Sequence, residues 1–132
     1  MTEASLRSRL MLAMKVHAPQ IVALRHEDVR TCGIPDLSTT LNGTAWWEFK
    51  LADPDFKADG RQELTLLRLA HNGYARYVVW QTDLNRRPAT TYVVHPRCIG
   101  DYVKLADRSF SGFDMVALVR YMKGLHDIWQ GR

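Results

Sequence analysis

The spacing of hydrophobic residues along the chain predicts alternating helices and strands. Between residues 2 and 17, apolar side chains recur three or four positions apart, which is typical of an amphipathic helix, and Pro19 ends this pattern. Residues 61–71 and 113–129 repeat the helical spacing. Short runs rich in β-branched and aromatic residues predict strands at 21–24, 36–41, 44–51, 75–80 and 90–94.

The predicted order of elements, α-β-β-β-α-β-β-α, indicates the α/β class. We expect a single domain with a mixed central β-sheet and helices packed on each side. A chain of 132 residues is long enough for one domain and too short for two domains. We place the core of the domain at about residues 1–94 and a C-terminal helical extension at about residues 95–132. The last helix could belong to the core, to a dimer interface, or to both.

A turn signal at Asn42-Gly43 joins two of the predicted strands into a hairpin. Asp36 begins the first of these strands, and Glu48 lies on the second. Residues that face each other on adjacent strands are about 4.5–5.5 Å apart, so the two carboxylates would come together. Such carboxylates repel each other and resist joint ionisation, and a divalent cation bound between them removes the conflict. Hard oxygen ligands suit Mg²⁺, and we expect Mn²⁺ to substitute for it.

Lys50 adds a third charged group to this position. Because side chains alternate along a strand, Lys50 projects to the same face as Glu48, whereas Trp47 and Phe49 project to the other face. A cation bound by the carboxylates can polarise a phosphoryl oxygen and lower the pKa of a bound water. Lys50 could orient that water or stabilise the charge that develops on the phosphate. These residue types predict metal-assisted hydrolysis of a phosphodiester.

The same residues resemble the signature of the PD-(D/E)XK nuclease superfamily, which consists of Pro35-Asp36, a spacer and Glu48-Phe49-Lys50 in this chain. Gly33 precedes the motif, Gln62 opens the following helix, and a helix-Gly-strand passage covers residues 69–79. These features are similar to the VRR-NUC and Holliday-junction-resolvase-like branches of the superfamily. The resemblance implies a restriction-endonuclease-like core with the order α-β-β-β-α-β.

The resemblance, which covers roughly the first 81 residues, also implies roles for individual residues. Asp36 and Glu48 would bind the metal ion together with the backbone carbonyl of Phe49, and Lys50 would be the catalytic lysine. Gln62 would support the site or contact the phosphate.

Further site residues follow from the same resemblance and from position in the chain. Many members of the superfamily have a Glu in the first helix that reaches the metal, and Glu3 is the acidic residue of this predicted helix. Glu27 and Asp28 are the alternatives. The candidate phosphate contacts, which flank the predicted site along the chain, are Arg25, Arg30 and Arg61.

Composition changes this interpretation little. The net charge of +4 and the pI near 9.3 fit binding to a polyanion without requiring it. The two cysteines lack the spacing of a metal site. No apolar run is long enough to span a bilayer, and the N-terminus lacks a signal-peptide pattern. We therefore expect a cytoplasmic protein without a membrane partner, and the small size suggests a phage or mobile-element origin.

The leading hypothesis is a Mg²⁺-dependent DNA endonuclease that acts on branched or junction DNA. A homodimer is expected, because a symmetric dimer presents two sites to two strands. One alternative is a catalytically inactive module that binds nucleic acid or protein, and another is a nuclease that acts on RNA. In the plainest alternative, Glu48 and Lys50 are a surface ion pair and Asp36 is only a turn residue.

Overall fold

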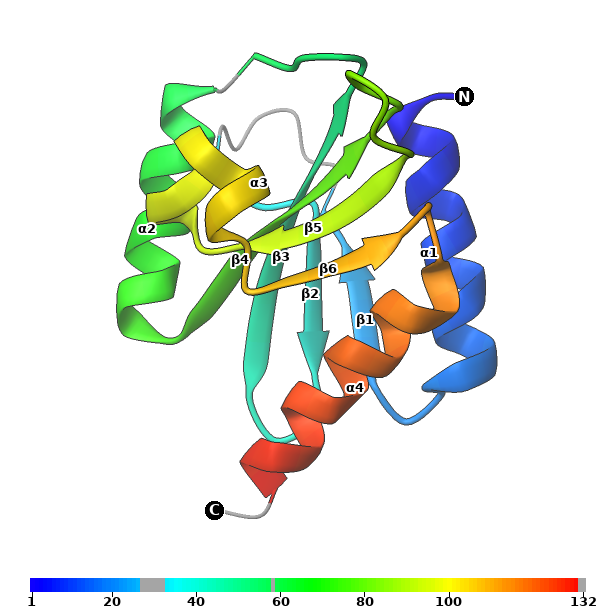
Figure 1. Cartoon of the computed structure of the whole chain (residues 1–132). Coiled ribbons are helices and arrows are strands. Elements are labelled where there is room, and N and C mark those ends of the chain that lie inside the picture. The colour runs from blue at the N-terminus through cyan, green and yellow to red at the C-terminus, as the bar shows by residue number, and fades with distance from the viewer. Residues whose placement is uncertain (27–32, 58, 131–132) are drawn as a thin grey trace.

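A six-stranded mixed sheet runs through the molecule, with helices on both faces (Figure 1). The computed structural model describes residues 1–26, 33–57 and 59–130. The elements in chain order are α1 (Glu3–His17), β1 (Val22–Arg25), β2 (Leu37–Thr40), β3 (Thr44–Ala52), α2 (Gly60–Asn72), β4 (Tyr74–Gln81), β5 (Thr90–Val94), the 3-10 helix η1 (Pro96–Asp101), α3 (Tyr102–Leu105), β6 (Arg108–Ser111) and α4 (Met115–Gln130).

The strands lie in the sheet in their order along the chain, β1-β2-β3-β4-β5-β6. Neighbouring strands are antiparallel, except that β3 and β4 are parallel and α2 connects them. The predicted mixed α/β sheet flanked by helices is therefore confirmed. Every predicted helix and strand is present, with ends that shift by one or two residues.

Residues 95–132, which the sequence indicated only as a helical extension, contain more than helices. After η1 and α3 the chain returns to the sheet as β6, which pairs with β5. The sequence did not reveal β6 because this strand is short, lies at the edge of the sheet and is mostly exposed, so its side chains need no alternating pattern. The last helix, α4, packs on the sheet and belongs to the main core.

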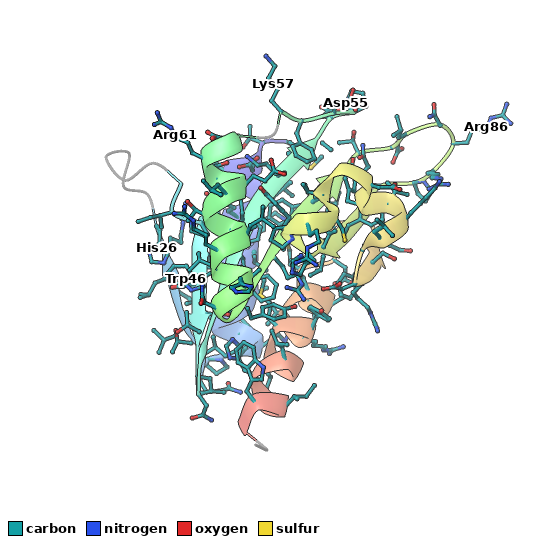
Figure 2. The ribbon with its side chains drawn as sticks, turned by 90° about the vertical axis from the view of Figure 1, so that its left-hand side faces the viewer. His26, Trp46, Asp55, Lys57, Arg61 and Arg86 are labelled. Atoms are coloured by element: carbon teal, nitrogen blue, oxygen red, sulfur yellow. The ribbon has the colours of Figure 1, made fainter. Side chains whose placement is uncertain are left out.

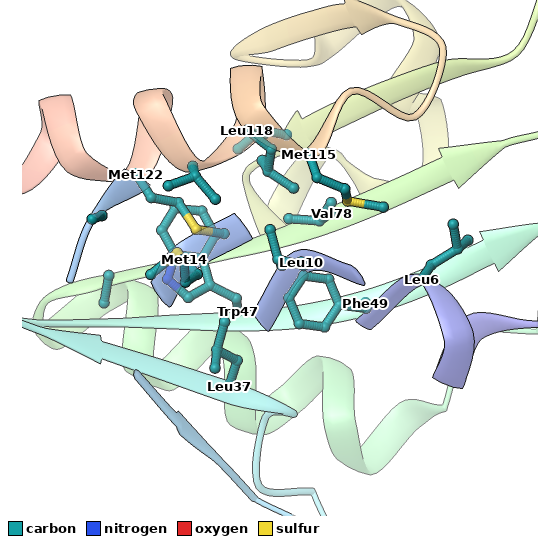
Figure 3. Packing of buried hydrophobic residues seen from close by; sticks show 14 of the residues in the cluster. Leu6, Leu10, Met14, Leu37, Trp47, Phe49, Val78, Met115, Leu118 and Met122 are labelled. Atoms are coloured by element: carbon teal, nitrogen blue, oxygen red, sulfur yellow. The ribbon is translucent and has the colours of Figure 1, made fainter. Parts of the chain in front are cut away.

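The larger of the two cores lies between the sheet and the pair α1 and α4 (Figure 3). Trp47 and Phe49 of β3 point into it and meet Leu10 of α1 and Met122 of α4. Fully burying a side chain of this size contributes roughly 1.5–3 kcal/mol to folding, so this core anchors β3 firmly. The residues that form this core are Leu6, Leu10, Met14, Ala18, Ile21, Leu37, Ala45, Trp47, Phe49, Val78, Trp80, Val93, Met115, Leu118, Val119 and Met122.

The opposite face of the sheet is covered by α2, η1 and α3. Leu66 of α2 packs there against Tyr77 and Val79 of β4, and Trp46 lies at the border of this second core. Trp46 and Trp47 therefore face opposite sides of β3, as strand alternation predicts. None of the helices in the described part of the chain is long and apolar enough to cross a membrane.

Candidate active site

The length of the β2–β3 loop decides which residues face each other in the hairpin. Thr40 pairs with Thr44, so residues 41–43 form the loop, one residue more than the predicted turn. Continuing this register beyond the paired strands places Asp36 opposite Glu48. A loop shorter by one residue would slip the register and separate the two carboxylates onto opposite faces.

Two backbone groups fix the positions of the paired acids. The Asp36 N–H donates to Oε1 of Glu48 at 3.1 Å, and the Phe49 N–H donates to Oδ2 of Asp36 at 2.9 Å. The N–H and C=O of one strand residue point toward the same neighbouring strand, so the Phe49 carbonyl also lies on the Asp36 side. The structure thus brings Asp36 and Glu48 together and places the Phe49 backbone beside Asp36.

The environment of Glu48 opposes its ionisation. Its side chain is only 2% exposed. Burial, reinforced by the negative charge of Asp36, raises the pKa of Glu48 from its ordinary value of 4.5 to about 8, although the positive charge of Lys50 opposes the rise. Without an added cation, the two carboxyl groups therefore resist joint ionisation at neutral pH.

Lys50 and Gln62 lie beside Glu48 and contact each other. The Lys50 Nζ donates to Oε1 of Gln62 at 2.8 Å and lies 4.0 Å from Oε2 of Glu48. Asp59 is the N-cap of α2, where its Oδ1 accepts from the backbone N–H groups of Arg61 and Gln62. Because this cap fixes where α2 begins, it places Gln62 in the first turn, within hydrogen-bond distance of Lys50.

Glu3 approaches the same edge of β3 from α1. A capping box between Thr2 and Ser5 begins this helix. The Glu3 Oε2 accepts the Leu51 N–H at 3.2 Å, two residues along β3 from Phe49, a distance of about 7 Å in a strand. Within the described ranges, no three His, Cys, Asp or Glu side chains are grouped so that they could hold a metal ion. Glu3 therefore lies beside the acidic pair and is not grouped with it.

Arg7 is the site residue that sequence reasoning missed. Its Nη1 lies 3.0 Å from Oδ1 of Asp36, in an ion pair whose side chains are 24% and 16% exposed. The signal was present, because Arg7 follows Glu3 by four positions and residues four apart share one helix face.

The candidate phosphate contacts have different outcomes. Arg25 is exposed at the end of β1, and Arg61 is exposed in the first turn of α2. Figure 2 shows Arg61 and Lys57 projecting outward from the end of the molecule where α2 begins. The remaining predicted candidates, Arg30 with Glu27 and Asp28, lie outside the residues that the structure describes.

Gly33, three residues before Asp36, touches the backbone of α2. Its φ is +94°, a conformation that L side chains rarely adopt. A Cβ atom at this position would lie 2.8 Å from Oγ1 of Thr65 and 3.1 Å from the carbonyl oxygen of Arg61. The absence of a side chain at Gly33 therefore lets the segment before Asp36 pack directly against α2, the helix that contains Gln62.

We expect Gly33→Ala to destabilise the protein, because both the strained φ and the steric overlap oppose the side chain. The loss should be on the order of 1–3 kcal/mol in the free energy of unfolding, measured by thermal or urea denaturation. Gly124→Ala is the matched control: a Cβ there meets nothing within 4 Å, and α4 should gain up to about 1 kcal/mol. Equal stability of Gly33→Ala and the native protein would contradict the proposed contact.

The donor atoms at this site fit a hard divalent cation. Two carboxylates and one backbone carbonyl are oxygen ligands of the kind that Mg²⁺ binds while it keeps several waters. Burial and the negative charge of Asp36 raise the pKa of Glu48, and such an ion would supply positive charge that stabilises the ionised pair. In the structure, Arg7 and Lys50 provide part of that charge.

No protein-family model matches this chain, and a search of curated proteins finds no significant relative.

Proposed function

We propose that this protein is a Mg²⁺-dependent endonuclease that hydrolyses phosphodiester bonds in DNA, on a fold of the PD-(D/E)XK type. The observation that carries the proposal is the placement of Asp36 opposite Glu48, with Lys50 4.0 Å from Glu48 on the same face of β3. A structural role alone would not require a buried carboxyl group beside a second carboxylate, because such a pair opposes folding unless a cation compensates it.

Each residue has a defined task in this proposal. Asp36, Glu48 and the Phe49 carbonyl would hold the cation, which would supply polarisation of a phosphoryl oxygen and a lower pKa for the attacking water. Lys50 directs its Nζ toward the reacting phosphate, where it stabilises the developing negative charge. Gln62 holds that ammonium group through the 2.8 Å hydrogen bond and so limits its positions before the substrate binds.

DNA with branches or junctions is the proposed substrate, and a homodimer is the proposed active form. The support is the net charge of +4 and the exposed Lys57 and Arg61 at the end of the molecule where α2 begins. The motif resemblance to junction-resolving nucleases adds to it. Two sites in a symmetric dimer would act on two strands.

A second candidate function is a catalytically inactive module that binds nucleic acid or protein. The observation that favours it is the Arg7–Asp36 ion pair, because this cation already neutralises a proposed metal ligand. The complete set of Asp36, Glu48, Lys50 and Gln62 favours the nuclease, since a binding module has no use for it.

A cleavage assay on a panel of substrates tests the proposal. Linear duplex, single strand, flap, four-way junction and single-stranded RNA would each be incubated with Mg²⁺, Mn²⁺ or EDTA. We expect metal-dependent cleavage of DNA, strongest on a branched substrate, and none in EDTA. Lys50→Ala, purified in parallel, controls for contaminating nuclease. Binding without cleavage of any substrate would favour the inactive module, and cleavage of RNA alone would overturn the choice of DNA.

A further inference from the structure

Both carboxylate oxygens of Asp36, the proposed metal ligand, already have a hydrogen-bond donor. Oδ2 accepts the Phe49 N–H at 2.9 Å. Oδ1 accepts from Nη1 of Arg7 at 3.0 Å. A cation shared with Glu48 would use the negative charge of the same carboxylate, so the guanidinium and the metal ion compete for Asp36.

The two positive charges also repel each other at this distance. An arginine that stayed within about 4 Å of a divalent cation would oppose its binding strongly in a partly buried site. Metal binding therefore favours the release of Arg7 from Asp36. Among the residues that the structure describes, the buried Nε of Arg7 has no hydrogen-bond partner, so the guanidinium keeps a donor that a new acceptor could use.

If Arg7 leaves Asp36, the phosphate of the substrate would be its new hydrogen-bond acceptor in a nuclease site. The guanidinium is planar and matches two phosphate oxygens with two parallel N–H groups. Arg7 reaches Asp36 from α1, whereas Lys50 lies beside Glu48 and is bound by Gln62 of α2. A phosphodiester bound at the cation would therefore have Lys50 on one side and Arg7 on the other.

We infer that Arg7 is the counter-ion of Asp36 in the metal-free protein and, once the metal ion displaces it, binds the non-bridging oxygens of the substrate phosphodiester. This inference rests on the proposed function. It makes Arg7 a catalytic residue and couples metal binding to the availability of a phosphate-binding group.

Metal titration without nucleic acid tests the first half of the inference. Mg²⁺ and Mn²⁺ affinities would be measured by calorimetry for the native protein, Arg7→Gln, Arg7→Lys and Arg9→Gln. Arg9 is exposed on α1, so Arg9→Gln makes the same change in net charge as Arg7→Gln. We expect Arg7→Gln to bind metal on the order of tenfold more tightly than the native protein and than Arg9→Gln. Arg7→Lys, which keeps the charge, should lie near the native affinity.

Substrate binding tests the second half. In a Lys50→Ala background with saturating Mg²⁺, fluorescence anisotropy would measure the affinity for a labelled junction. We expect Arg7→Gln to weaken it by about tenfold or more, the effect of one charge-assisted pair, and Arg7→Lys to recover part of the loss. Arg9→Gln should change it little.

The outcomes separate this inference from the proposed function. Unchanged or weaker metal binding in Arg7→Gln, with normal binding in the native protein, overturns the inference alone, because a purely structural Arg7 would position Asp36 and its loss would weaken the site. Unchanged substrate affinity overturns the phosphate contact. A native protein that binds neither Mg²⁺ nor Mn²⁺ overturns the proposed function, and the inference with it.

Discussion

Glu48→Gln is expected to abolish metal-dependent cleavage while the protein stays folded. The amide keeps an oxygen that can accept the Asp36 N–H, so the hairpin retains its hydrogen bond. It removes the negative charge that a cation requires, and the cleavage rate should fall by at least 10²–10³-fold, as for other charge-stabilising groups. Single-turnover cleavage of a junction substrate at saturating Mg²⁺ measures the loss, and circular dichroism verifies the fold.

The matched control for this change is Glu63→Gln, the same substitution one residue after Gln62. It should retain cleavage within a few-fold of the native rate. Native-like cleavage by Glu48→Gln would show that the acidic pair is not the metal site, even if the protein were a nuclease.

The metal-free protein is expected to lose stability as pH rises from about 4.5 to 8. The folded protein keeps Glu48 protonated up to a pKa of about 8, whereas the unfolded chain releases this proton near 4.5. The folded state therefore binds more protons across this interval, and its stability falls with increasing pH. The contribution is on the order of 4 kcal/mol over the interval, at about 1.4 kcal/mol per pKa unit.

Urea denaturation in EDTA at pH 5 and pH 8 measures this effect. Glu48→Gln should remove most of the difference between the two pH values, whereas Asp55→Asn, at an exposed loop position, should retain it. Adding Mg²⁺ at pH 8 should restore stability to the native protein and to Asp55→Asn but not to Glu48→Gln, because the ion binds the deprotonated carboxylates. A pH dependence that is identical in the native protein and Glu48→Gln would contradict the raised pKa.

Strand alternation was sufficient to predict which face of β3 carries Glu48 and Lys50. The sequence places Glu48 and Lys50 on one side and the aromatic residues on the other, and the core buries Trp47 and Phe49 as expected. The prediction works here because a β-strand has a fixed period of two, so a local pattern determines which side each residue faces.

The remaining features of the site depend on contacts between segments that are distant in the sequence. Arg7 meets Asp36 only because α1 packs against the sheet next to the hairpin. The close approach of Gly33 to Thr65 depends on where α2 lies, which no local pattern encodes. The three-residue loop at 41–43 also could not be predicted from the sequence, because Asn-Gly by itself favours a two-residue turn.

The position of α4 has a consequence for the synthesis of this protein. All proposed site residues lie in the first half of the chain, but the core beneath β3 is completed by Met115, Leu118 and Met122 from its last helix. A nascent chain that has not yet released α4 from the ribosome lacks this support for α1 and β3. We therefore expect the candidate site to take its final geometry only after α4 has been synthesised and has packed on the sheet.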